Sequence, residues 1–299
     1  MPDEACRQVP PQEAVPASAG SNRPSGLVLV STPIGNLGDM TARARETLAA
    51  ADLVLAEDTR NTARLLSALG IAARLAALHD HNEEAQIPTV LGLLRQGRTV
   101  ALVSDAGTPL ISDPGYRLVR AAIAEGLPVG AAPGASAVLT ALVLSGLPPH
   151  PFLFLGFPPP RQAARLAAFA SLRAAERAGL AATLIWHEAP HRLGEALADA
   201  QATFGDRQGA VGRELTKRFE EVRRGRLSDL SAHFAAIAPR GEITLLVGPP
   251  EQDDPEDLDG KLAQALASNS VKDAAALVAA ATGLPRKLVY ARALALSRS

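Results

Sequence analysis

Short apolar runs alternate with helix-length segments along most of the chain. In the N-terminal half the apolar runs are four to six residues long, and amphipathic or Ala-rich stretches separate them. This βαβα rhythm is typical of a mostly parallel sheet covered by helices. The strands expected in this half are Leu27–Ser31, Leu53–Ala56, Leu75–Leu78, Thr99–Ser104 and Pro128–Ala132.

A second α/β block follows Ser145–His150, a Gly- and Pro-containing segment with the character of a linker. Its expected strands are Phe152–Gly156, Thr183–Trp186, Gly209–Gly212, Val222–Arg226 and Glu242–Val247. Residues 250–260 are acidic and predict a hinge, and two short helical patterns split near Gly283 follow it. We therefore predict a disordered extension (1–25), an N-terminal α/β domain (26–147), a C-terminal α/β domain (148–250) and a small helical segment (260–299).

Composition narrows the class of protein. The 299 residues are 47% hydrophobic and 20% charged, as in an ordinary globular chain. A net charge of −1 means that any RNA binding must use a local basic patch, and 3% aromatics argues against a base-stacking platform. The single Cys6 rules out an intrachain disulfide and a zinc-binding cysteine cluster, and the spacing of the His residues does not match a metal-binding motif. No apolar run is long enough to span a membrane, so the cytoplasm is the expected compartment.

Three loops rich in Gly, Pro, Ser, Thr and Asp follow expected strands, at residues 31–39, 104–115 and 132–137. Ligands of open α/β sheets bind beyond the carboxyl ends of strands, and Gly lets a backbone approach a ligand closely. Small residues such as Ala135 and Ser136 leave room for a group the size of adenosine. Each loop alone could be an ordinary turn, but three in one half favour a binding site.

Several carboxylates follow strand ends and are candidates for acid–base chemistry. Glu57 and Asp58 are adjacent after the second strand, where Asp58 is better explained as a helix N-cap. Asp39 and Asp113 are either site residues or turn residues. Asp105 points more strongly to a ligand, because it closes a buried strand and begins a Gly loop.

The second block contributes a histidine and a basic run. His187 follows a strand and is either a proton acceptor or a satisfied polar residue at a strand end. Residues 213–226 hold six basic and three acidic side chains, which form either a phosphate-binding rim or a solvated face. A long Arg- and Ala-rich helix is expected over about Arg161–Ala178, and its start adds Arg161 and Arg165 to this basic run. The candidate RNA contacts are Arg161, Arg165, Arg213, Arg218, Arg223 and Arg224.

Taken in order, these segments resemble one family. The chain carries S-T-P-I-G-N-L-G-D, A-E-D-T-R, S-D-A-G-T-P-L-I-S-D-P-G, P-G-A-S-A, H-E-A-P-H-R-L and R-E-L-T-K. This series resembles the ribosomal RNA small subunit methyltransferase I family, from about Leu27 to Val247 and again near the C-terminus. Two departures are a Pro158–Arg165 run without Lys, and Trp186-His187 where Phe or Tyr is common, which weakens a catalytic role for His187.

The resemblance implies a two-domain tetrapyrrole-methylase-like fold (class III methyltransferase), with S-adenosylmethionine held between the domains, and a homodimer. The expected substrate is the ribose 2′-OH of cytidine 1402 of 16S rRNA in the 30S subunit. Members of the wider fold place cofactor contacts at or near positions that here are Pro33, Ala106, Thr108, Ile111, Ala135, Ser136, Glu188 and Leu215, to which we add Asp105 and Gly107. No metal is expected.

A ribose hydroxyl is a poor nucleophile, so a base or a cation should assist it. The candidates are Lys217, Asp39, Glu57, Asp58 and Asp113, and the sequence does not choose among them. The C-terminal segment is expected to bind RNA through Lys272, Arg286 and Lys287. Two rival functions remain: a methyltransferase acting on a carbon of a tetrapyrrole, and a non-catalytic RNA-binding protein of ribosome assembly.

Overall fold

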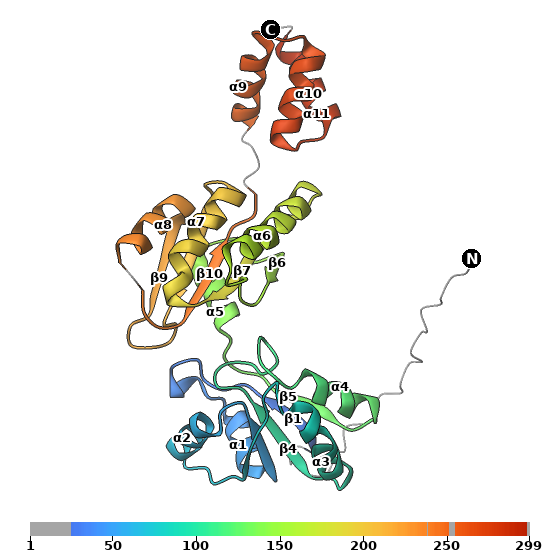
Figure 1. Ribbon diagram of the computed structural model, residues 1–299, viewed down its shortest axis with the longest axis vertical. Coiled ribbons are helices and arrows are strands. Elements are labelled where there is room, and N and C mark those ends of the chain that lie inside the picture. Colours follow the sequence, from blue (N-terminus) through green and yellow to red (C-terminus); the bar gives the residue numbers. More distant parts are fainter. Residues whose placement is uncertain (1–24, 238, 251–254, 298–299) are drawn as a thin grey trace, which may run out of the picture. The chain divides into compact units, whose positions relative to one another are not determined.

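The computed structural model describes residues 25–237, 239–250 and 255–297 (Figure 1). Apart from Ser25, the extension expected over residues 1–25 lies outside this part of the chain. Backbone contacts divide the chain into two compact units. Of the described residues, unit 1 contains 25–30, Ala42–Asp105 and Pro114–Pro133, and unit 2 contains Ser31–Thr41, Ala106–Asp113 and those from Gly134 onward.

Unit 1 is built on a five-stranded sheet in which every pair of neighbours is parallel, in the order β3-β2-β4-β1-β5. The prediction of a parallel sheet is confirmed for this unit. The central strand β4 is buried at every residue, which explains its continuous apolar sequence. The strands are β1 (Gly26–Val30), β2 (Leu53–Ala56), β3 (Leu75–Ala77), β4 (Thr99–Val103) and β5 (Val129–Ala132).

Four helices connect these strands. Figure 1 shows α1 (Ala42–Ala50) and α2 (Thr59–Leu69) on one side of the sheet, and α3 (Glu83–Arg95) and α4 (Tyr116–Ala124) on the other. Right-handed crossovers in this strand order require that division. The sequence pattern predicts the last of these helices over Pro114–Ala124, but α4 begins two residues later, because Gly115 has φ 117°, outside the helical region.

Unit 2 contains a second five-stranded sheet, in the order β6-β7-β10-β8-β9. Only β6 and β7 are parallel, and the other neighbours are antiparallel. The strands are β6 (Phe152–Phe154), β7 (Thr183–Glu188), β8 (Gln208–Arg213), β9 (Glu221–Arg226) and β10 (Ile243–Val247). The helices are α5 (Ala137–Ser145), α6 (Gln162–Arg177), α7 (Leu193–Phe204) and α8 (Leu227–Ala236), with the short η2 (Pro190–Arg192) before α7.

Alternate side chains of this sheet enter two cores. Ile185, Ala210 and Leu246 pack against α5, whereas Leu184 and Trp186 enter the core that includes residues of α6, α7 and α8. This alternation follows from the period of two along a strand. Residues 134–147, which the sequence pattern assigns to the N-terminal domain, thus pack through α5 on the second sheet.

The C-terminal residues form a three-helix bundle of α9 (Pro255–Leu266), α10 (Val271–Thr282) and α11 (Arg286–Leu296). Two of these helices were predicted, and the break between them is confirmed by the left-handed Gly283. The third, α9, replaces part of the expected acidic hinge. The bundle has its own core, which includes Leu262, Ala274, Val278, Val289 and Ala293. Within the described residues, none of the helices has the length and apolar character needed to cross a membrane.

Candidate functional site

The three Gly/Pro loops are joined by hydrogen bonds within unit 2. Thr32 and Gly107 exchange backbone hydrogen bonds of 2.8 and 3.1 Å, and Gly107 has φ 79°, which favours glycine. The Thr108 hydroxyl is 3.1 Å from the Ser31 hydroxyl and donates to the carbonyl oxygen of Ala135 at 3.2 Å. Thr108 therefore connects the first, second and third loops.

The joined loops meet the strand ends of the second sheet. Ile34 and Ala135 belong to the same apolar cluster as Leu215, which follows β8. A Cβ placed on Gly156, after β6, would lie 3.6 Å from Ser112 Oγ, and Gly156 accepts the backbone N–H of His187. Of the expected cofactor contacts, Gly107, Thr108 and Ala135 take part in the hydrogen bonds that join the loops, Leu215 shares an apolar cluster with Ala135, and Glu188 is the last residue of β7. The other expected contacts are neighbours of these residues in the three loops: Pro33, Ala106, Ile111 and Ser136.

Two of these residues have a visible structural role. Ser136 is the N-cap of α5, and its hydroxyl accepts the N–H of Leu139. Glu188 is 3% exposed, accepts the N–H of Ala189 and pairs with Arg192 at 2.6 Å.

Unpartnered polar atoms remain at this edge. Glu188 Oε2 and Thr216 Oγ1 are buried and have no hydrogen-bond partner among the described residues. Buried polar atoms are normally hydrogen-bonded, so these two suit a polar ligand such as a nucleoside. The small side chains of Ala106 and Ala135 and the exposed apolar side chain of Ile111 lie in the same loops.

Lys217 lies in the loop after β8, where Glu214 and Thr216 have positive φ values of 50° and 65°. Its Nζ is 2.8 Å from Glu214 Oε1 and 3.3 Å from Glu242 Oε2. Partial burial acts to lower the pKa of Lys217, but the two carboxylates outweigh it and raise that pKa. A lysine that stays protonated cannot act as a general base. Of the two roles expected for Lys217, base or stabilising cation, this geometry therefore fits the cation.

The remaining candidates of unit 2 are less constrained. Asp39 ends the short helix η1 (Leu37–Asp39), which Asn36 caps, and its side chain is exposed. Asp113 is half-buried.

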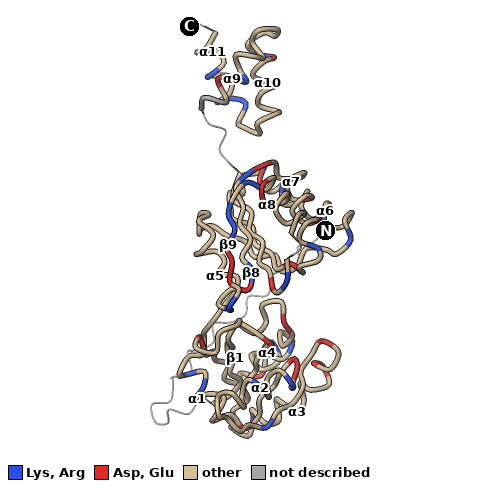
Figure 2. The backbone as a smooth tube through the Cα atoms, turned by 90° about the vertical axis from the view of Figure 1, so that its left-hand side faces the viewer, with Lys and Arg blue, Asp and Glu red and all other residues tan. Residues whose placement is uncertain are grey.

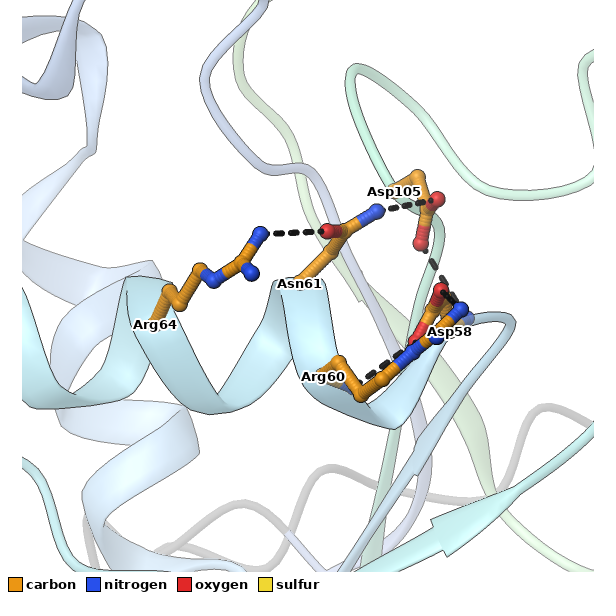
Figure 3. Close-up of polar contacts among 5 residues, drawn as sticks. All are labelled: Asp58, Arg60, Asn61, Arg64 and Asp105. Carbon is orange, nitrogen blue, oxygen red and sulfur yellow. Dashed lines mark hydrogen bonds and ion pairs between the residues drawn. The ribbon is translucent and has the colours of Figure 1, made fainter.

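A second group of carboxylates lies in unit 1, at the carboxyl ends of β2 and β4 (Figure 3). Asp105 accepts the backbone N–H of Asp58 at 3.1 Å and the side-chain amide of Asn61 at 2.8 Å. Its side chain is thus directed to the start of α2, whereas the residues after it belong to unit 2. The sequence did not indicate Asn61, because its partner is 44 positions away.

The two adjacent carboxylates of this group differ in basicity. Hydrogen bonds from the side chain and backbone of Arg60 lower the pKa of Asp58 to about 2, and Asp58 is the N-cap of α2, which confirms the capping interpretation. Burial, followed by the charges of Asp105 and Asp80, raises the pKa of Glu57. Glu57 is therefore the stronger proton acceptor of the pair.

His187 is packed between aromatic rings. Its ring centroid is 5.0 Å from that of Phe154 and 5.6 Å from that of Phe157. Its Nδ1 lies 3.4 Å from Thr244 Oγ1, and burial lowers its pKa. The contacts favour the packed strand-end interpretation over a proton acceptor.

Arg165 does not reach the surface. It is 0% exposed, and its guanidinium lies 2.7 Å from Asp199 and 3.2 Å from Glu195. The expectation that it contacts RNA disagrees with this burial, because a phosphate has no access to the group. The helical pattern of α6 did not reveal the pairing, since Asp199 is 34 positions away on α7.

The other arginines of the expected rim lie nearer to solvent. Arg161 is exposed at the start of α6. Arg218, Arg223 and Arg224 are exposed around β9, and Figure 2 shows basic residues along this strand. Arg224 donates to the carbonyl oxygen of Leu144, and half-buried Arg213 pairs with Glu221 at 2.9 Å. Among the described residues no group of three His, Cys, Asp or Glu is arranged to hold a metal ion.

Comparison with known proteins agrees with this geometry. The family model described as Tetrapyrrole (Corrin/Porphyrin) Methylases matches residues 26–231. Diphthine synthase has a similar structure, with a TM-score of 0.56 and 16% identity over 74% of this chain and 89% of that chain. The structure of uroporphyrin-III-C-methyltransferase from Thermus thermophilus is also similar, with a TM-score of 0.50 and 22% identity over 74% of this chain and 93% of that chain. The fold and the site therefore define a methyltransferase of the tetrapyrrole methylase class, whose methyl donor is S-adenosylmethionine.

More specific matches define the family. A model described as the RsmI C-terminal HTH domain matches residues 252–297. The protein named ribosomal RNA small subunit methyltransferase I from Micromonospora olivasterospora is 50% identical over 272 residues, which cover 88% of this chain and 85% of that protein. The protein of the same name from Escherichia coli O157:H7 is 43% identical over 282 residues, which cover 92% of this chain and 97% of that protein. The chain belongs to the ribosomal RNA small subunit methyltransferase I family, so the resemblance seen in the sequence is confirmed.

Proposed function

We propose that this methyltransferase modifies 16S rRNA, at the ribose 2′-oxygen of cytidine 1402 in the small ribosomal subunit. The observation that carries the proposal is 50% identity, over 88% of the chain, to a protein named for methylation of small-subunit rRNA. The atom and the nucleotide come from the family resemblance. The C-terminal match adds a segment that a tetrapyrrole methylase does not need.

When bound, S-adenosylmethionine supplies an electrophilic methyl group. The residues proposed to hold it are those of the joined loops, with Thr108 at their junction, together with the strand ends at Glu188 and Leu215. The hydrogen bonds that join these loops fix the shape of this surface before a ligand arrives. Such positioning of reactants supplies much of the rate enhancement of a group transfer.

The 2′-hydroxyl must lose its proton as the new bond forms. We assign the role of proton acceptor to Glu57, since its pKa is raised, and not to Asp58, whose carboxylate is bound to Arg60 and caps α2. Lys217 has the role of a fixed cation that orders the loop at Gly35. Asp39 and Asp113 remain as further candidates in unit 2.

The proposed RNA contacts on unit 2 are the solvent-accessible arginines. Arg218, Arg223 and Arg224 lie on and beside β9, the edge strand of the second sheet. Phosphate contacts of this type position an RNA without reading its sequence. Arg161 and Arg213 complete the set, and Arg165 is not part of it.

Transfer of labelled methyl from S-adenosylmethionine tests this function against its rivals. Unmodified small subunits, protein-free 16S rRNA and a porphyrin precursor would be offered in parallel. Label in the subunit rRNA is the expected result. Label in the tetrapyrrole alone would support the first rival, and no label in any acceptor would support the non-catalytic one.

We further propose that the protein acts as a homodimer in the cytoplasm, where its substrate is found. Leu139 and Val143 lie one turn apart on α5 and are 52% and 73% exposed. Exposed apolar patches on a helix commonly mark protein interfaces. Sedimentation velocity should give a dimer for the native chain and a monomer for Val143→Glu.

A further inference from the structure

The C-terminal bundle has a basic hollow on its surface. Lys272, Arg286, Lys287 and Tyr290 line it, and we call these four residues the basic hollow. Lys272 belongs to the first turn of α10, and Arg286 and Lys287 are the first two residues of α11. Lys272 precedes Arg286 by 14 positions, so side chains from the starts of two different helices line the basic hollow.

The three cations of the basic hollow are available to a ligand. All three are exposed, and none forms an ion pair within the described part of the chain. In contrast, Arg292 on the same helix is paired with Asp259. Desolvated or paired charges are poor anion receptors, whereas exposed unpaired cations gathered at one place attract phosphates strongly.

The backbone adds to this positive charge. The helix α11 begins after Pro285 without a side-chain cap. The N–H of Leu288 donates to the carbonyl oxygen of Pro285 at 2.8 Å, so the N–H groups without an acceptor among the described residues are those of Arg286 and Lys287. Helix N-termini carry a partial positive charge and bind phosphate oxygens. At the start of α10, by comparison, the Ser270 hydroxyl occupies the N–H of Asp273.

Tyr290 gives the basic hollow a second kind of contact. It lies four residues after Arg286 and three after Lys287, which places it on the same face of α11. Its side chain is 43% exposed although it is a large ring. Exposed aromatic rings beside cations stack on unpaired bases of RNA.

We propose that the basic hollow binds the phosphate backbone of rRNA, with one unpaired base stacked on Tyr290. This inference rests on the proposed function for the identity of the RNA. It assigns to the bundle a docking role, separate from the methyl-transfer site. Removing the basic hollow therefore weakens capture of the subunit and leaves the chemical step unchanged.

The test compares the full-length protein with the triple variant Lys272→Gln/Arg286→Gln/Lys287→Gln. Arg292→Gln is the matched control, because it removes one positive charge from α11 outside the basic hollow. The triple variant should raise KM for small subunits about tenfold or more and leave kcat unchanged. Loss of three phosphate contacts should also reduce the slope of log K against log salt by about 2, at roughly 0.7 per single-strand contact. Tyr290→Ala should weaken binding with little change in slope, and Tyr290→Phe should restore it.

Circular dichroism of each variant establishes that the bundle remains folded. A KM and a salt slope equal to those of Arg292→Gln would overturn the inference, as would a loss confined to kcat. Failure of the proposed function has a different signature, because the unsubstituted protein would then leave the rRNA unlabelled. Binding to 16S rRNA fragments tests the basic hollow in that case too, and an unchanged salt slope there would reject it.

Discussion

Lys217 passes directly over Gly35, so that a Cβ on Gly35 would lie 2.2 Å from Lys217 Cγ. The contact joins the first Gly/Pro loop to the loop after β8, and the ammonium continues to Glu214 and Glu242. No side chain fits at position 35 unless Lys217 moves. The glycine of the first loop is therefore required by a protein neighbour, independently of any ligand.

Gly35→Ala should displace Lys217 and with it the first Gly/Pro loop, which we propose holds the cofactor. We expect a stability loss of about 1–3 kcal/mol from overpacking, and a fall in methylation rate of about 10²-fold from mispositioning. Gly92→Ala is a suitable control, since that helical glycine has nothing within 4 Å of its added Cβ. Thermal unfolding and initial rates measure both effects, and a fully active Gly35→Ala protein would show that the contact is unimportant.

Thr108→Val should weaken binding of S-adenosylmethionine. The substitution keeps the volume but removes the hydroxyl that links Ser31 and the carbonyl of Ala135. Loss of these hydrogen bonds costs about 1–2 kcal/mol, or roughly tenfold in Kd. Isothermal calorimetry is the measurement, with Ser171→Ala on the exposed face of α6 as the control. An unchanged Kd for S-adenosylmethionine would show that the hydrogen bonds of Thr108 do not contribute to cofactor binding.

Glu57→Gln should reduce the rate of methyl transfer by about 10²–10⁴-fold without unfolding the protein. In the native protein the rate should rise with pH through the pKa of Glu57, which burial and neighbouring carboxylates raise above the ordinary value for a glutamate. The sign follows because only the ionised carboxylate accepts a proton, so activity is lost as pH falls through that pKa. In the Glu57→Gln variant the rate should not show this rise with pH.

Asp58→Asn provides the comparison for Glu57. It keeps a capping oxygen at the start of α2, and its pKa of about 2 excludes it from titration in the working range. Its pH profile should match that of the native protein. If Asp58→Asn removed the acidic limb and Glu57→Gln kept it, the two roles would be exchanged.

Arg165→Ala should destabilise the protein and leave RNA affinity unchanged in the folded fraction. The substitution leaves Asp199 buried without its partner, which costs about 3–5 kcal/mol. Urea unfolding measures the loss, and Arg223→Ala on exposed β9 should show the reverse pattern. Weaker RNA binding by correctly folded Arg165→Ala protein would instead show that Arg165 contributes to RNA binding.

Much of the fold could be predicted because its signals are local. The strands of unit 1 are short apolar runs, and all five match the expected ranges to within one residue at each end. The helix α3 was missed because Pro88 and Gly92 interrupt its pattern, yet α3 packs on α4 and β4 and tertiary contacts stabilise it. The helix α9 was missed because its first residues are acidic and follow a charged run.

The candidate site was only partly predictable. Local composition identified the three loops, but their connection through Thr108 depends on residues 77 and 27 positions away. Spacing likewise cannot show that Arg165 faces Asp199, or that Lys217 is held between two carboxylates. Such pairings arise from the packing of distant elements, and a single sequence does not encode them as a local pattern.

The most direct test of the account is to identify the modified nucleoside itself. Small subunits that lack the modification would be incubated with the protein and S-adenosylmethionine, and the rRNA fragment spanning position 1402 analysed by mass spectrometry. We predict 2′-O-methylcytidine at that position and no other new methyl group. A methyl group on a base, on another nucleotide, or on no nucleotide at all would contradict it.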